Sequence, residues 1–169
     1  MQVRKQDGTM NEATLRADPK FSRFLEYLGD KAGQKRWASR ADFDPLDIPG
    51  LLPNLWLIEI KPDKPRLLVR LTGTQVDLAY AGSLRGQFME EIDWGPSSQR
   101  IIASLQRMAD TGERHFVDFS ALASEDRSVH VRRLGVPLSD DQSRMSHLLM
   151  LAFYNETFAT PEHFTELWF

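Results

Sequence analysis

The chain contains no cysteine among its 169 residues. This absence excludes a disulfide scaffold, a thiolate zinc site, a cysteine nucleophile and any chromophore attached through a cysteine sulfur. The chain also lacks an excess of positive charge, because 21 basic and 24 acidic residues leave a formal net charge of −3. A protein that binds nucleic acid mainly through electrostatics carries a basic excess, so we expect no nucleic-acid partner.

Long apolar runs are absent as well. The longest run, residues 148–154, is far shorter than the roughly 20 residues that cross a bilayer. The basic pair near the N-terminus is followed by polar residues, so we expect no secretory signal and place the protein in the cytoplasm. With 41% apolar and 27% charged residues, the composition is that of a globular domain.

The N-terminal part of the chain divides into a flexible arm and a helix. Residues 1–17 are polar and show no periodicity, whereas Asp18 and Pro19 are typical of the first turn of a helix. An apolar stripe follows at i, i+3, i+4 and i+7, which either packs on the chain's own domain or pairs with a second copy across a two-fold axis. The candidate dimer or interaction residues in this stripe are Phe21, Phe24, Leu25 and Leu28.

Five later segments have the alternating or continuous apolar character of β-strands. Short helices and one longer helix lie between the second and third segments, and hairpin-length connections make the last three antiparallel. The fourth segment changes the parity of its apolar residues, which a β-bulge near Arg132 and Arg133 would explain. The order predicts an α+β fold, with a five-stranded antiparallel sheet, helices on one face and an N-terminal flanking helix. The five segments are residues 55–60, 66–72, 115–120, 129–138 and 146–154.

This order of elements resembles that of a PAS domain. The resemblance is carried by the proline-rich run at residues 43–53 and by Arg-Leu-Thr-Gly-Thr at residues 70–74, together with Trp37, Arg40, Arg66, Gly82 and Gly86. It is closest to a subfamily of short, often free-standing bacterial PAS proteins. The chain then divides into a flexible arm (1–17), a flanking helix region (18–40), a PAS-like domain (41–156) and a C-terminal tail (157–169).

The resemblance implies a non-catalytic sensory or regulatory module of signal transduction. It would bind a small apolar or carboxylate ligand between the sheet and the central helices, or dock a signalling partner, and we expect a homodimer. The absent cysteine excludes covalently linked flavin, and a histidine-free helix at residues 97–111 disfavours haem, so a noncovalent ligand or an empty core remains. The candidate ligand-binding residues are Arg70, Thr72, Phe88, His115, Val117 and Phe119.

Several alternatives remain open beside this interpretation. Arg70 either clamps a carboxylate or forms an ion pair with Glu59 or Asp118. The protein is a ligand-free adaptor, or an α+β enzyme that uses Asp118 with His115 or His130 as an acid–base pair. His115, His130 and His147 fall on successive strands and could converge on one sheet face, although we predict no metal site and no catalytic residues. The basic residues 31–40 are predicted to form a solvated face rather than a nucleic-acid surface.

Overall fold

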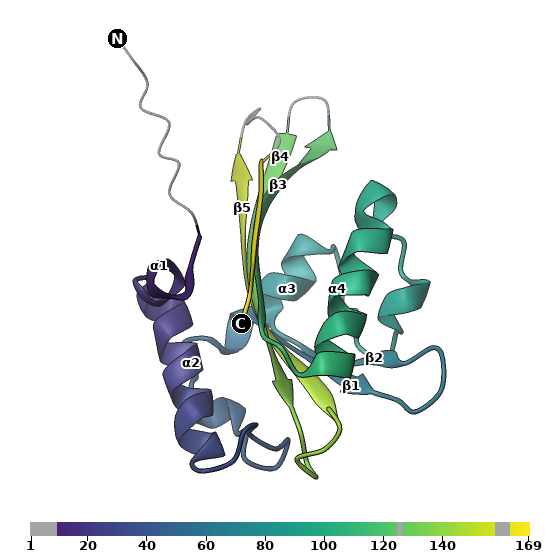
Figure 1. Ribbon diagram of the computed structural model, residues 1–169. Coiled ribbons are helices and arrows are strands. Elements are labelled where there is room, and N and C mark those ends of the chain that lie inside the picture. The colour runs from purple at the N-terminus through teal and green to yellow at the C-terminus, as the bar shows by residue number, and fades with distance from the viewer. Residues whose placement is uncertain (1–9, 125–126, 158–162) are drawn as a thin grey trace.

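The computed structural model describes residues 10–124, 127–157 and 163–169, and it shows a six-stranded antiparallel sheet (Figure 1). The strand order is β2-β1-β5-β4-β3-β6, so the α+β class is confirmed and one strand is added to the predicted five. The strands are β1 (Leu55–Ile60), β2 (Leu67–Thr72), β3 (His115–Ser124), β4 (Arg127–Leu138), β5 (His147–Thr157) and β6 (His163–Trp168). The helices are α1 (Glu12–Arg16), α2 (Pro19–Ala32), α3 (Thr74–Ala79) and α4 (Ser98–Thr111), with 3₁₀ turns at Pro45–Asp47, Leu52–Asn54, Met89–Glu91 and Gly95–Ser97.

Different helices cover the two faces of the sheet (Figure 1). Helices α1 and α2 cover one face, called here the α2 face, where Leu57, Leu134 and Leu151 belong to the core. Helices α3 and α4 lie on the opposite side, called here the α4 face, where Val69 and Met150 belong to a second core. The predicted flanking helix therefore supplies a third layer, and the sheet is the middle one.

Helix α2 begins at the position that the sequence predicts. Asp18 Oδ1 accepts a hydrogen bond from the N–H of Lys20 at 2.9 Å, as an N-cap does. Phe21 packs edge-to-face on Phe116 and Phe153, with ring centroids 5.3 and 5.5 Å apart. The predicted dimer contact is therefore corrected, because the stripe covers the chain's own sheet. Its members Phe21, Phe24, Leu25 and Leu28 are at most 3% exposed within a single chain.

Both ends of the chain contribute elements that the sequence analysis did not predict. Helix α1 lies within the predicted arm, and its Leu15 is 1% exposed because it joins the core of the α2 face. Strand β6 lies within the predicted tail and pairs antiparallel with β3, so that Trp168 stands opposite His115. In the described ranges, no helix has the length and apolar character needed to cross a membrane.

Strand β4 is regular where a bulge was predicted. Its pairing with β5 is continuous over residues 128–138, and its pairing with β3 is unbroken at Arg132 and Arg133. The apolar residues change parity for another reason, which is that both faces of this strand are covered. Leu134 packs in the core of the α2 face, whereas Val131 has the parity of Arg133 and lies on the α4 side.

The motif at residues 70–74 turns the chain from β2 into α3 against the proline-rich run. The N–H of Gly73 donates to the carbonyl of Leu55 at 2.8 Å. A Cβ atom at Gly73 would lie 2.3 Å from the carbonyl oxygens of both Leu52 and Pro53. This backbone approach leaves no space for a side chain, which explains the glycine in the motif.

Candidate functional site

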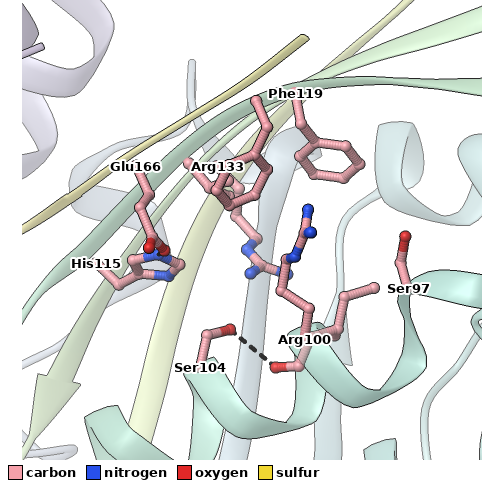
Figure 2. Close-up of a pocket in the computed structure, with 10 residues that line it drawn as sticks. Ser97, Arg100, Ser104, His115, Phe119, Arg133 and Glu166 are labelled. Carbon is pink, nitrogen blue, oxygen red and sulfur yellow. Dashed lines mark hydrogen bonds and ion pairs between the residues drawn. The ribbon is translucent and has the colours of Figure 1, made fainter. Parts of the chain in front are cut away.

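A small cavity lies between α4 and the strands β3, β4 and β6 (Figure 2). Its volume is about 30 Å³, which is close to the share of one water molecule in liquid water. The wall formed by β3 consists of alternate residues, because every second side chain of a strand points to the same face. These residues are His115, Val117 and Phe119, and they face Arg100, Ile101 and Ser104 of α4.

Arg133 carries a positive charge into the cavity from β4. It stands opposite Val117 of β3 and Ala152 of β5, and only 7% of it is exposed. Within the described part of the chain it forms no ion pair, and its Nε is buried without a hydrogen-bond partner. Burial lowers the pKa of Arg133, because the charged form loses its hydration, yet an arginine stays protonated in proteins.

Arg100 brings a second guanidinium to the same cavity from α4. Its Cζ lies 4.3 Å from the centre of the Phe164 ring of β6, which is a cation–π distance. Figure 2 shows the guanidinium groups of Arg100 and Arg133 extending toward one another. Two like charges in a partly desolvated space raise the local positive potential, which favours an anion between or beside them.

His115 and Glu166 form a hydrogen-bonded pair at the other end of the cavity. His115 Nε2 lies 3.0 Å from Glu166 Oε2, and the imidazole stacks on Trp168 with ring centroids 4.0 Å apart. Burial, together with the nearby charge of Arg133, lowers the pKa of His115 to about 4 despite the opposing effect of Glu166. The imidazole is therefore neutral near pH 7 and donates its Nε2–H to Glu166, which leaves Nδ1 as an acceptor.

Further buried polar atoms without partners lie on the α4 face. Trp56 Nε1 and Tyr154 Oη have no hydrogen-bond partner among the described residues, and the same holds for His115 Nδ1. The ring of Tyr80 lies 5.4 Å from that of Trp56 and 5.6 Å from that of Tyr154, both edge-to-face. Buried polar groups are normally satisfied, so this concentration is typical of a place that a polar molecule occupies.

Three of the six predicted ligand-binding residues meet at the cavity. His115, Val117 and Phe119 line it, as their shared parity on β3 requires. Phe88 does not belong to its lining, and instead forms an isolated β-bridge with Leu68 of β2 while its side chain is half-buried.

Arg70 and Thr72 lie in a different, open groove beside His147. The Arg70 side chain is 57% exposed, and its Nε lies 3.4 Å from Glu59 Oε2. The Thr72 hydroxyl donates to the carboxylate of Asp77. The predicted carboxylate clamp at Arg70 is therefore corrected to an exposed ion pair, one of the alternatives that the sequence left open.

The histidines of successive strands do not converge on one face. His115 points to the α4 face, whereas Asp118, at the opposite parity of β3, points to the α2 face and lies 2.6 Å from His130 Nε2. An acid–base pair of Asp118 with His115 is thus wrong, and the pair of Asp118 with His130 lies outside the cavity beside Arg132. Within the described residues, no group of three or more histidine or carboxylate side chains is placed to hold a metal ion.

Internal ion pairs neutralise part of the basic region at residues 31–40. Lys31 Nζ lies 2.9 Å from Asp47 Oδ2, and Lys35 binds the carboxylate of Asp42. The hydrogen bond from Lys35 lowers the pKa of Asp42 to about 2. These contacts fit the prediction of a solvated face rather than a nucleic-acid surface.

The sequence analysis missed Arg133, the residue on which the cavity depends. The available signal was the pair Arg132–Arg133 in the middle of an apolar strand, where one arginine must face each side of the sheet. The predicted bulge concealed this signal, because it assigned the parity change to the backbone.

An antiparallel sheet and a helical layer that enclose a small cavity fit the class of protein that the motifs at residues 43–53 and 70–74 indicate. A family model described as "PAS domain" matches residues 16–152. This match covers more than half of the chain, so the chain belongs to the PAS domain family. No curated protein and no solved structure matches the chain. The narrower likeness to short free-standing bacterial PAS proteins stays a prediction.

Proposed function

We propose that the protein is a non-catalytic sensory or regulatory module of signal transduction that binds a small molecule in the cavity beneath α4. Membership of the PAS domain family supports the sensory role. The observation that carries ligand binding is the buried guanidinium of Arg133, which faces the cavity with its Nε unsatisfied among the described residues. A core without a ligand would be more stable with an apolar side chain there.

The lining favours binding over acid–base catalysis. His115 has a pKa of about 4 and is therefore a weak base near pH 7. Its Nε2 is engaged by Glu166, and Asp118 lies on the other face of the sheet. The residues of the cavity thus resemble those of a recognition site, with a few polar groups on apolar walls.

Strand β4 offers a route by which occupancy of the cavity reaches the surface. Arg133 faces the cavity, while the next residue, Arg132, donates a hydrogen bond of 2.8 Å to Asp18 at the start of α2. A shift of β4 on ligand binding would therefore alter the seat of the N-terminal helix. We expect a partner protein or a homodimer to respond to this change.

Mass spectrometry of the purified full chain, first native and then denatured, tests the proposal. We expect a stoichiometric additional mass that is released on denaturation. A clean mass of the chain alone, before and after incubation with a metabolite extract, would contradict ligand binding. It would favour the ligand-free interaction adaptor instead.

A further inference from the structure

The charge of Arg133 lacks the counter-charge that other arginines of this chain have. It is 7% exposed, which makes it more buried than any other arginine in the described ranges. The ion pairs of more exposed arginines join guanidinium and carboxylate at 2.8 to 3.2 Å, and they involve Arg16, Arg66, Arg107 and Arg132. The chain thus pairs its accessible arginines and leaves a deeply buried one without an acid.

We propose that the cavity binds a small organic acid whose carboxylate accepts hydrogen bonds from Arg133, with Arg100 completing the site from α4. This inference rests on the proposed function and names the ligand class of that site. A guanidinium presents its N–H donors in a planar fork that matches the two oxygens of a carboxylate.

The acid that the cavity itself contains does not serve as the counter-charge. Glu166 lies in the lining, but its Oε2 accepts the hydrogen bond from His115 Nε2 at 3.0 Å. Its side chain is 43% exposed, so much of its charge is hydrated. The buried positive charge of Arg133 therefore remains available to a ligand.

The walls of the cavity favour an acid with a short apolar body. Ile101, Val117, Phe119 and Phe164 provide apolar surface around the two guanidinium groups. The volume of about 30 Å³ admits a head group of a few atoms. Inorganic anions share this charge but have no apolar body, so the test has to separate the two sources.

Isothermal titration calorimetry of the full chain with propionate, at fixed ionic strength, tests the inference. Propionamide is the neutral probe of the same shape, and phosphate is the inorganic anion. We expect saturable binding of propionate, no binding of propionamide and weaker binding of phosphate. The variant Arg133→Met should reduce the affinity for propionate at least about tenfold, because it removes a charged hydrogen bond. Arg132→Met is the matched control, since it removes the neighbouring charge on the opposite face and should leave the affinity unchanged.

Thermal unfolding of the ligand-free variants separates recognition from a structural role. We expect Arg133→Met to melt at the wild-type temperature or above, because it removes a buried charge that has no counter-charge. A lower melting temperature would show that Arg133 stabilises the fold and would count against the inference. Arg100→Met, at an exposed position of α4, provides a second test that does not depend on tolerance in the core, and it should also weaken propionate binding.

The outcomes distinguish this inference from the proposed function. Equal binding of propionamide and propionate would overturn the anionic ligand class and leave the sensory cavity intact. Tighter binding of phosphate than of propionate would replace the organic acid with an inorganic anion and so overturn the inference as stated. Absence of binding by all three probes overturns it too, and a clean native mass in addition would remove the proposed function.

Discussion

Arg132 and Arg133 are consecutive residues of β4 whose guanidinium groups lie on opposite faces of the sheet. Arg132 binds Asp18 at the start of α2 and covers the ring of Phe21, with Cζ 5.0 Å from its centroid. Arg133 points into the cavity beneath α4. One peptide bond therefore joins the N-terminal helix to the candidate ligand site, and strands pass such displacements on because they are tightly packed on both sides.

The seat of α2 depends on Asp18. Asp18→Ala removes both the N-cap and the partner of Arg132, and we expect the free energy of unfolding to fall by about 2 kcal/mol. Asp18→Asn keeps an acceptor for the N–H of Lys20 and should cost about half as much. Asp30→Asn, an exposed change in the same helix, is the control. Urea unfolding measures all three, and equal losses for the two Asp18 variants would contradict a role for the ion pair.

The stripe on α2 is expected to act as core and not as a dimer contact. Phe24→Ala should lower the free energy of unfolding by about 3 to 5 kcal/mol, because Phe24 is fully buried. The oligomeric state, measured by light scattering under conditions where the variant stays folded, should equal that of the wild type. The control Leu46→Ala removes a side chain that is 76% exposed and should change stability by less than about 0.5 kcal/mol. Dissociation of a wild-type dimer by Phe24→Ala would restore the interface hypothesis.

The turn at Gly73 is expected to tolerate no side chain. Gly73→Ala places a Cβ against two backbone carbonyls and should destabilise the fold by about 2 kcal/mol or more. Gly29→Ala is the matched control, since it lies in the interior of α2 with no atom within 4 Å of the added methyl group. That change should stabilise the protein by about 0.5 to 1 kcal/mol. Equal effects of the two substitutions would show that the close approach at Gly73 is not rigid.

The stability of the protein should fall as the pH is lowered from about 6.5 to about 4, partly because of His115. Burial and Arg133 depress the pKa of His115 in the folded state to about 4, from 6.5 in the unfolded chain. Between these values the unfolded chain binds the proton more tightly, so this group contributes a slope of up to about 1.4 kcal/mol per pH unit, with full stability above pH 6.5.

His115→Phe should flatten the pH dependence while keeping an aromatic ring against Trp168. His163→Gln, at a side chain that is 50% exposed, is the control. The comparison with the wild type isolates His115, because His147, whose pKa is also lowered by burial, is present in both proteins. Identical slopes for wild type and His115→Phe between pH 4.5 and 6.5 would contradict the depressed pKa.

Much of the fold could be predicted because it is written in local patterns. The cap at Asp18, the strand alternation at His115, Val117 and Phe119, and the order of the elements all follow from the sequence. Strand β6 escaped prediction because it is short and polar at its exposed positions, and because its pairing with β3 depends on contacts distant in sequence.

The candidate site was predicted only on the β3 side. The sequence analysis assigned the carboxylate clamp to Arg70, which the structure places in an ion pair with Glu59. It missed Arg133 because parity was judged as though helices covered a single face. A three-layer arrangement allows apolar residues on both parities, and under that condition the arginine pair becomes informative.

The position of β2 and β6 at the two ends of the strand order limits how copies of this chain can share a sheet. Each face already carries its own helices, so a second chain cannot stack directly on the strands. A marginal strand, in contrast, directs backbone N–H and C=O groups outward. Any joining of two copies through the sheet therefore runs along a margin, where the alignment of main-chain groups sets the geometry and side-chain shape has a secondary role.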